Sequence, residues 1–302
     1  MAMLDGKTVA VTGAGRGIGR AVAMACAAAG AKVVVNDLGV TMDGADPTAS
    51  VAQSVVDEIV AAGGEALANT SSVTEMAGGA SIVQTALDAW GRIDGVVCVA
   101  GIIREKMLFN MTEEEWDSVI ATHLKGTFTL FRAASEVMRK QEGGGSLIGF
   151  TSGAFAASVA QSNYAAAKAG IVSLVRSAAA GLNKYNVNAN CIAPVAKTRM
   201  SENVPFAIPD MGEPEDVAPM AVYLLSDAAR SITGQIYTVS GGKVAVWNQP
   251  VEVRAMWKSD GRWTPEELAE RVPNAIGTEE MPILAQLAKY RAAAAAGSKP
   301  NA

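Results

Sequence analysis

The sequence predicts an α/β fold, a doubly wound parallel sheet of about seven strands followed by a C-terminal helical extension. Three observations predict it. Short apolar and β-branched runs alternate with longer helical segments along most of the chain. The strand segments are apolar on both faces, as in a sheet that helices cover on both sides. A glycine-rich turn, TGAGRGIG (12–19), separates the first strand segment from the first helical one.

The expected elements follow one another in strict alternation. Strands are expected at 7–13, 31–37, 65–73, 94–101, 145–152, 187–194 and 234–242. Helices are expected from Ile18 to Ala29, over 50–64 and 76–91, from Thr112 to Lys140, and over 162–184 and 213–227. Parallel strands need crossover connections, which are right-handed, so this order winds the chain into an open sheet with helices on both faces.

The alternation stops after Gly242. We therefore predict one domain over residues 1–242 and an extension over 243–302, which at about sixty residues is too short to support a core of its own. Within it, TPEELAE predicts a helix that Thr264 caps, with Pro265 in the first turn and Glu267 completing a capping box. The last residues, AAAAAGSKPNA, are expected to fray.

Composition narrows the class of protein. The net charge of −5 argues against a nucleic-acid partner, because binding phosphates requires clustered Lys and Arg. The three cysteines, 26, 98 and 191, stand singly in apolar runs, which predicts reduced, buried residues and neither disulfides nor a metal site. The longest run of small apolar residues, AVAMACAAAG, is too short to span a bilayer. We expect a cytoplasmic protein with no membrane partner.

The glycine-rich turn predicts a dinucleotide cofactor site of the Rossmann type. Its glycines let backbone N–H groups approach a pyrophosphate, which the following helix N-terminus also attracts. Asp37 ends the second strand segment, where a carboxylate can accept hydrogen bonds from ribose hydroxyls and repels a 2′-phosphate. This favours NAD over NADP. Arg16 is the counter-argument, since a basic residue in the turn could accommodate that phosphate.

A tyrosine and a lysine four residues apart indicate acid–base chemistry. Tyr164 and Lys168 in SNYAAAKAG share one helix face. A phenol with a pKa near 10 is a poor base at neutral pH, and a nearby ammonium should lower that value. Ser152, at the end of the fifth strand segment, could hold a substrate oxygen facing Tyr164. In an alcohol dehydrogenation the phenolate would take the hydroxyl proton, and in reduction the phenol would return it.

Over residues 4–242 the chain resembles the short-chain dehydrogenases/reductases. The matching motifs are TGAGRGIG, ND after the second strand, SSV, VAGI, HLKGTF, TSGA, YAAAK, IAPVAKTRM and VSGG. Within that family, VVVNDLG, ALDAWGRID, HLKGTF and NCIAPVAKTRM are similar to the (3R)-hydroxyacyl-CoA dehydrogenase domain of the peroxisomal multifunctional enzyme.

The resemblance implies a role for each site residue. Tyr164 would be the acid/base and Ser152 the orienting hydroxyl, while Lys168 would also bind the nicotinamide ribose. Ser72 and Val73 would meet the adenine, and the loop from Pro194 through Val195 to Thr198 the nicotinamide amide. The remaining cofactor contacts would be Gly13, Arg16, Gly17, Ile18, Gly19, Asp37, Leu38, Ala100 and Gly101.

The chain departs from the family pattern at three places. The usual asparagine-rich motif after the fourth strand is CVAG (98–101), so the contacts there would rest on backbone. Val195 replaces the glycine that usually follows Pro194. Ser152 stands one residue closer to Tyr164 than usual, which makes Thr151 a rival for its role.

His123 is the only histidine in the sequence. The family commonly has asparagine here, with a backbone carbonyl that holds a water linked to the lysine, whereas the hydroxyacyl-CoA branch tends to carry histidine. We therefore expect His123 to be a relay or helix-kink element secondary to Tyr164. The alternative is a half-buried imidazole without a kinetic role.

These residues predict an NAD-dependent oxidoreductase that interconverts a secondary alcohol and a ketone on an apolar substrate. The substrate could be a 3-hydroxyacyl thioester, or a hydroxysteroid or terpenoid alcohol. A non-catalytic dinucleotide-binding sensor or scaffold is the alternative of another class. The apolar segment RMSENVPFAIPDMG corresponds to the family's substrate loop. The alanine-rich helices at 112–140 and 162–184 are of the kind that pairs subunits in this family, which implies a homodimer or homotetramer.

Overall fold

The computed structural model describes residues 2–40, 49–198, 211–279 and 281–295. The chain divides into two compact units, Met1–Trp247 and Asn248–Ala302, which are described separately below.

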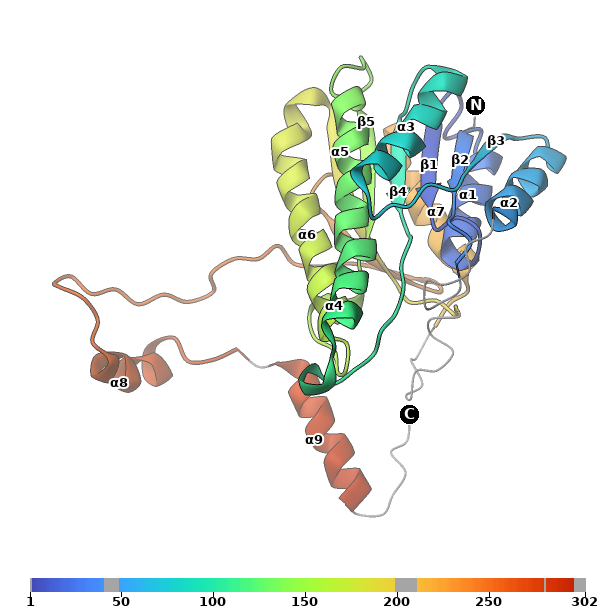
Figure 1. The fold of residues 1–302 in the computed structure, drawn as a ribbon. Helices are drawn as coiled ribbons and strands as arrows, with labels where there is room; N and C mark the ends of the chain where they lie inside the picture. Colours follow the sequence, from blue (N-terminus) through green and yellow to red (C-terminus); the bar gives the residue numbers. More distant parts are fainter. Residues whose placement is uncertain (1, 41–48, 199–210, 280, 296–302) are drawn as a thin grey trace. The chain divides into compact units, whose positions relative to one another are not determined.

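The first unit is built on one eight-stranded sheet (Figure 1). Its strands are β1 (Thr8–Thr12), β2 (Lys32–Asn36), β3 (Glu65–Asn69), β4 (Gly95–Cys98), β5 (Gly145–Phe150), β6 (Val187–Pro194), β7 (Ile236–Ser240) and β8 (Lys243–Val246). They lie in the order β3-β2-β1-β4-β5-β6-β7-β8, and each neighbouring pair is parallel except β7 and β8. The order reverses between β1 and β4, so the predicted doubly wound sheet is confirmed.

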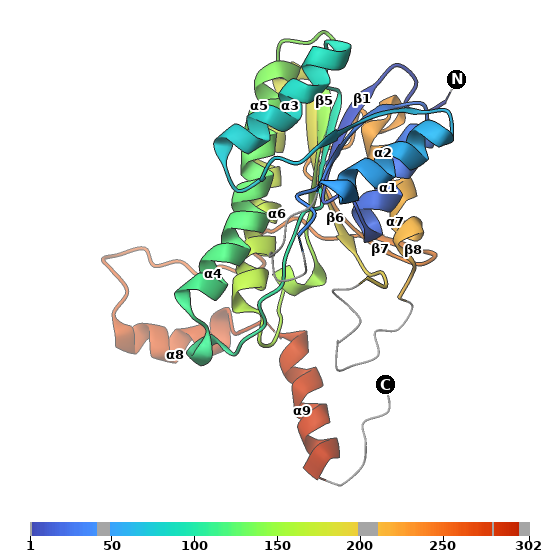
Figure 2. The ribbon, with the colours of Figure 1, turned by 45° about the vertical axis from the view of Figure 1, so that its right-hand side comes forward.

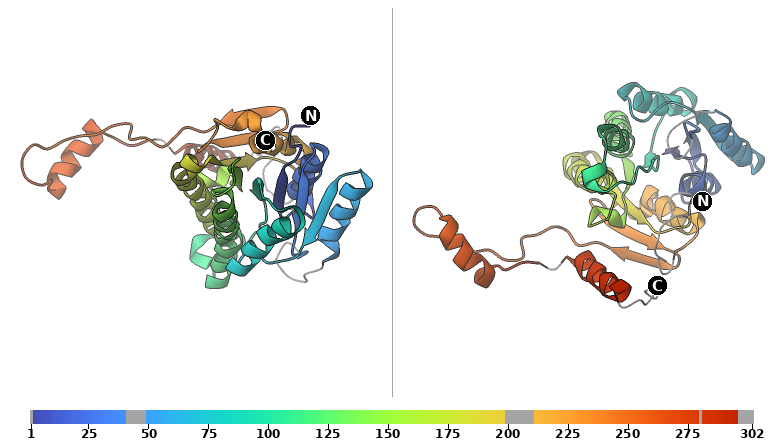
Figure 3. Two further views of the ribbon diagram at one scale, coloured as in Figure 1. Left: turned by 90° about the horizontal axis from the view of Figure 1, so that it is seen from above. Right: turned by 60° about the horizontal axis from the view of Figure 1, so that its bottom comes forward.

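Helices cover both faces of this sheet (Figures 2 and 3). The first core forms where α1 (Gly17–Ala28), α2 (Ser50–Ala61) and α7 (Pro214–Leu225) pack against one face. The second forms under α3 (Met76–Trp90), α5 (Gly126–Met138) and α6 (Ser162–Leu182) on the other. Buried valines, isoleucines and alanines of the strands feed both cores, which explains why the strand segments read as apolar on both faces. The three cysteines are buried and free, as predicted.

The helix expected from Thr112 to Lys140 is interrupted. It consists of α4 (Glu113–Ile120), a π-helical segment (Ala121–Lys125) and α5. Thr112 caps α4 through a capping box with Glu115, whose side chain accepts from the Thr112 N–H. The π-helical segment widens the helix at His123, and such single-turn interruptions are frequent at functional sites.

The sheet continues past the predicted domain boundary. Residues 243–246 were assigned to the extension, but they form β8, which turns back at Gly241 and pairs antiparallel with β7. The unit boundary lies after Trp247. The division of roles between a catalytic domain and a C-terminal extension stays a prediction.

The second unit contains two helices in the part of the chain that the structure describes, α8 (Pro265–Ala275) and α9 (Pro282–Ala295). Thr264 caps α8 with Pro265 in the first turn, and Glu267 completes the capping box, as predicted. Lys258 forms an ion pair with Glu267, and this lowers the pKa of the carboxyl. Helix α9 was not predicted, and most of the tail expected to fray lies outside the described residues.

The helix α6 and the turn after it, Ser162–Tyr185, are long and apolar enough to cross a membrane by length and composition alone. Lys168 and Arg176 interrupt this segment, so it is not a continuous apolar run in the sequence. In the structure α6 packs on β5 and β6 and buries Asn163 and Lys168, so one face of the helix belongs to the core of the fold.

Candidate active site

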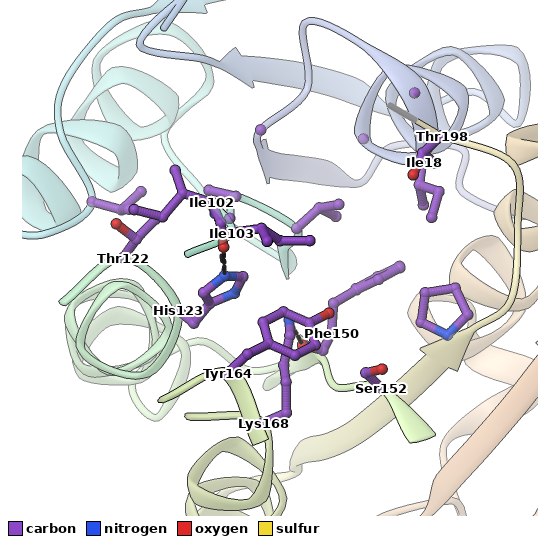
Figure 4. A pocket seen from close by; sticks show the side chains of 18 of the residues that line it. Ile18, Ile102, Ile103, Thr122, His123, Phe150, Ser152, Tyr164, Lys168 and Thr198 are labelled. Atoms are coloured by element: carbon purple, nitrogen blue, oxygen red, sulfur yellow. Dashed lines mark hydrogen bonds between the residues drawn. The ribbon is translucent and has the colours of Figure 1, made fainter. Parts of the chain in front are cut away.

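A cavity of about 1110 Å³ opens at the carboxyl ends of the central strands. Every site residue predicted from the sequence lines it: Gly13, Arg16, Gly17, Ile18, Gly19, Asp37, Leu38, Ser72, Val73, Ala100, Gly101, His123, Ser152, Tyr164, Lys168, Pro194, Val195 and Thr198. In Figure 4, Ile18 and Thr198 lie across the pocket from Tyr164 and Lys168. The fold thus brings residues that are far apart in the sequence, from Gly13 to Thr198, together at the topological switch point of the sheet.

The glycine-rich turn forms one wall of this cavity. A Cβ on Gly13 would lie 2.8 Å from the Ala100 Cα, and one on Gly19 would lie 2.0 Å from the Gly13 carbonyl oxygen. Gly17 opens α1 with a φ of +50°, in the left-handed region. The N-cap residue Arg16 supplies no side-chain acceptor to the helix within the described structure. The first N–H groups of α1 are therefore suited to an anion, as a dinucleotide pyrophosphate requires.

Asp37 lies directly after β2 and connects two loops of the pocket. Its Oδ2 accepts from the Gly15 N–H at 2.8 Å and its Oδ1 accepts from the Gly39 N–H at 2.7 Å. The carboxylate retains further lone pairs that can accept from hydroxyl groups. Arg16 is exposed and its Nη1 reaches the Val40 carbonyl at 3.4 Å. Both side chains line the cavity. Asp37, which favours NAD, and Arg16, which could accommodate the 2′-phosphate of NADP, can therefore both reach a bound cofactor.

Ser152 and Thr151 are adjacent but face different partners. Thr151 is buried and its hydroxyl donates to the Lys168 carbonyl at 2.9 Å. Ser152 is half-buried, lines the cavity and lies near enough to Tyr164 to lower the pKa of its phenol. The geometry therefore favours Ser152 over Thr151 as the hydroxyl that faces the substrate.

Tyr164 and Lys168 lie one turn apart on α6, as the i, i+4 spacing predicted (Figure 4). The Lys168 Nζ donates to the Phe150 carbonyl at 2.7 Å and lies 5.3 Å from the centre of the Tyr164 ring. The ammonium is thus held by the end of β5 and lies beside the phenol. Both side chains line the cavity next to Ser152.

The prediction that Lys168 lowers the pKa of Tyr164 is wrong, because the pKa of this phenol is raised in the structure. Burial raises the pKa of Tyr164 above its usual value, and the nearby Ser152 hydroxyl opposes that rise. Burial also lowers the pKa of Lys168 to about 7, so a large fraction of this amine is uncharged at neutral pH. The sequence reveals the spacing of the pair, but the burial that weakens the cation depends on the packing of α6 against the sheet.

His123 is a buried neutral imidazole. Its Nε2 lies 2.8 Å from the Ile102 carbonyl oxygen, and its ring meets the Tyr164 ring edge-on with centroids 5.2 Å apart. Burial, reinforced by the neighbouring Lys168, lowers its pKa to about 3. A Cβ on Gly101 would lie 2.2 Å from the His123 Cε1, so the imidazole needs a glycine there. The expectation of a helix-kink element agrees with the π-helical segment, while its kinetic role stays a prediction.

Asn163 was not singled out from the sequence. It is fully buried, and its Nδ2 donates to the carbonyls of Arg104 and Glu115 while its Oδ1 accepts from the Tyr164 N–H. It therefore ties the loop after β4 and the helix α4 to the first turn of α6. An asparagine directly before the predicted acid/base, at the start of a helix, is the signal that could have pointed to it.

The substrate loop was predicted over residues 199–212, of which 199–210 lie outside the described residues. Met211, just beyond them, lines the cavity, as do Ile102, Ile103 and Arg104 from the loop after β4.

Comparison with known proteins agrees with this geometry. The family model described as enoyl-(acyl carrier protein) reductase matches residues 13–243. A short-chain dehydrogenase from Mycobacterium avium, known from its crystal structure, is 45% identical with a TM-score of 0.82, over 92% of this chain and 97% of that one. The chain belongs to the short-chain dehydrogenase/reductase family. It is therefore an oxidoreductase of that family, whose fold implies a nicotinamide dinucleotide cofactor.

Two further relatives are similar to this chain, and the name of the first specifies a substrate class. A hydroxyacyl-CoA dehydrogenase from Mycobacterium tuberculosis is 40% identical over 284 residues, 88% of this chain and 87% of that protein. The peroxisomal multifunctional enzyme type 2 of Mus musculus is 41% identical over 239 residues. That match covers 79% of this chain but 32% of the mouse enzyme, so the chain spans about a third of it.

Proposed function

We propose that this chain is an NAD(H)-dependent oxidoreductase that interconverts a secondary alcohol and a ketone on an apolar acyl substrate. A 3-hydroxyacyl thioester is the leading substrate class. The observation that carries the proposal is that Ser152, Tyr164 and Lys168 line one cavity, which also receives the N-terminus of α1. The Lys168 Nζ lies 5.3 Å from the centre of the Tyr164 ring there.

The side chains can handle the proton of this reaction. In dehydrogenation the substrate O–H proton passes to the ionised Tyr164 oxygen, and the Ser152 hydroxyl orients the substrate oxygen. In ketone reduction the neutral Tyr164 donates its proton to the developing alkoxide. The nicotinamide, when bound, accepts or supplies the hydride at the carbinol carbon. Because burial raises the pKa of Tyr164, its protonated form is favoured at neutral pH, which suits reduction.

NAD is the proposed cofactor because of Asp37. Its carboxylate lies after β2 on the cavity wall, where a 2′-phosphate would meet a like charge. Binding of NAD and NADP by the wild-type protein and by Asp37→Ala, measured by calorimetry, tests this. We expect the variant to lose affinity for NAD and to gain relative affinity for NADP. An unchanged ratio of the two dissociation constants would remove the argument.

The substrate class rests on the cavity wall and on the relatives. Ile102, Ile103 and Met211 give an apolar wall, which suits an acyl chain. The hydroxyacyl-CoA dehydrogenase named above covers most of this chain at 40% identity. A hydroxysteroid or terpenoid alcohol is the second candidate, because the same apolar wall would accept a rigid ring system.

A coupled NADH-fluorescence screen separates these candidates. The panel would hold (3R)- and (3S)-hydroxyacyl-CoA esters of several chain lengths, hydroxysteroids and terpenoid alcohols, each with the corresponding ketone. We expect the highest kcat/KM for a hydroxyacyl-CoA. A higher value for a steroid or terpenoid would favour the second candidate, and no turnover of any member would refute the proposal.

We further propose that the protein is cytoplasmic and forms a homodimer or homotetramer. In the segment Ser162–Tyr185, only 33% of the most apolar stretch of 18 residues is buried within the chain. Phe128 on α5 is 43% exposed. A second copy that covers this face would remove the apolar area from water. Light scattering that gives the 31.0 kDa mass of one chain would reject the oligomer.

A further inference from the structure

The end of β8 reaches the loop that carries Ser152. Trp247 follows β8, and its backbone N–H donates to the Ile236 carbonyl at 2.9 Å. Its indole Nε1 donates to the Thr238 hydroxyl at 2.8 Å, which holds the ring over β7. The indole also packs on Phe155, with ring centroids 4.6 Å apart and planes inclined by 59°. Such aromatic pairs contribute stability beyond the area that they bury.

Phe155 belongs to a short turn that begins at Ser152. The 3₁₀ turn Gly153–Phe155 follows Ser152, whose carbonyl accepts from the Phe155 N–H at 3.0 Å. The Ser152 side chain accepts from the Ala154 N–H at 3.3 Å. Gly153 is exposed, and a Cβ on it would contact nothing within 4 Å among the described residues. The turn packs against α6, and the ring of Phe155 contacts both the second core and Trp247. This ring is therefore an anchor of the turn.

We propose that Trp247 is a positioning residue that holds Ser152 against Tyr164 through Phe155. The inference rests on the proposed function and adds to it a residue that the sequence assigned to the extension. The path runs from the β7–β8 hairpin to the indole, from the indole to the Phe155 ring, and from the turn to the serine hydroxyl. It lies wholly within the first unit.

The kinetic test compares three variants in the full-length protein. Trp247→Ala removes the ring on which Phe155 packs, and we expect kcat to fall about ten- to a hundredfold because misplacing an orienting group by about 1 Å has effects of this size. The dissociation constant for NAD should not change, because the glycine-rich turn is untouched. Trp247→Phe keeps an aromatic ring and should restore most of kcat. Val244→Ala, at an exposed position of β8, is the matched control and should behave as the wild type.

A second measurement does not depend on turnover. The phenol of Tyr164 is titrated by NMR with tyrosine labelled at the ring carbon that carries the hydroxyl, and the resonance is assigned by its loss in Tyr164→Phe. The nearby Ser152 hydroxyl lowers the pKa of Tyr164, so a displaced serine should make the phenol titrate at higher pH in Trp247→Ala. Phe155→Ala tests the same link with the indole intact, should Trp247→Ala fail to fold.

The outcomes are separable. A reduced kcat and a raised phenol pKa in Trp247→Ala or Phe155→Ala, with Val244→Ala unaffected, support the inference. A wild-type kcat and an unshifted titration in folded Trp247→Ala overturn it, as does an equal loss in Val244→Ala. If the wild-type protein turns over no substrate, the proposed function fails, and the titration alone then decides the inference.

Discussion

The two ends of the sheet use similar carboxylates for different purposes. At the amino end, Asp94 is only 7% exposed and its side chain accepts from the Thr8 N–H and from two nitrogens of Arg92. At the carboxyl end, Asp37 is half-buried, accepts from two loop N–H groups and lines the cavity. The first carboxylate is enclosed by its partners, and the second retains access to a ligand.

The difference teaches how to separate structural from functional polar groups in this fold. A polar side chain that precedes a strand uses its hydrogen bonds to connect neighbouring strands. One that follows a strand faces the crevice where the strand order reverses. Substitutions at the carboxyl end should therefore affect turnover or cofactor binding, and substitutions at the amino end should affect stability.

Tyr164→Phe should reduce turnover about a thousandfold, within the range for loss of a general acid or base. Calorimetry should show an NAD affinity close to that of the wild type, because the ring stays in place and only the hydroxyl is lost. Turnover within a few-fold of wild type would show that the phenol at the carboxyl end of the sheet is not the acid/base of the reaction.

Asp94→Ala should destabilise the protein by about 2–3 kcal/mol, since it leaves the buried Thr8 N–H without its acceptor and Arg92 without its partner. Urea unfolding measures this, with kcat unchanged in the folded protein. Asp37→Ala is the matched variant and should show the reverse pattern, a small loss of stability and an altered cofactor preference. Equal effects of the two substitutions on stability would break the comparison.

Lys168→Met should make stability less dependent on pH. The Lys168 pKa is lowered from its usual 10.5 to about 7 in the folded protein, so the unfolded chain binds the extra proton between these values. Below about pH 7 the buried charge destabilises the wild type fully. Its free energy of unfolding then rises as the pH increases from about 7 to about 10. We expect the variant to unfold at a higher temperature near pH 6, with the difference narrowing at higher pH. A constant difference would contradict the lowered pKa.

His123→Asn should have the smallest effect, a reduction of kcat by about three- to tenfold through loss of the edge contact with Tyr164. The imidazole keeps its pKa near 3, so no step in the pH–rate profile of the wild type should come from it. Turnover abolished in this variant but retained in Tyr164→Phe would reverse the assignment of the acid/base.

Much of the site could be predicted because local patterns dictate it. The glycine-rich turn, Asp37 after β2 and the Tyr164–Lys168 spacing depend on a few neighbouring residues, and the fold brings them to one cavity. The pKa of Lys168 and the orientation of Thr151 could not be predicted, since both depend on how α6 packs on β5.

The missed elements share a physical cause. Strand β8 has four residues after two glycines, and its pairing depends on β7 rather than on its own pattern. The π-helical segment at His123 depends on space that Gly101 provides from a distant part of the sequence. Asn163 gains its role only when α4 and the loop after β4 reach its amide.

The most direct test of the central claim is the pH dependence of kcat/KM for dehydrogenation of the best substrate from the screen. If Tyr164 takes the proton, the wild-type value should rise about tenfold per pH unit and level off above the pKa of the phenol, which burial places above its usual value. The residual activity of Tyr164→Phe should lack this rise. A flat wild-type profile, or the same rise in Tyr164→Phe, would contradict the account.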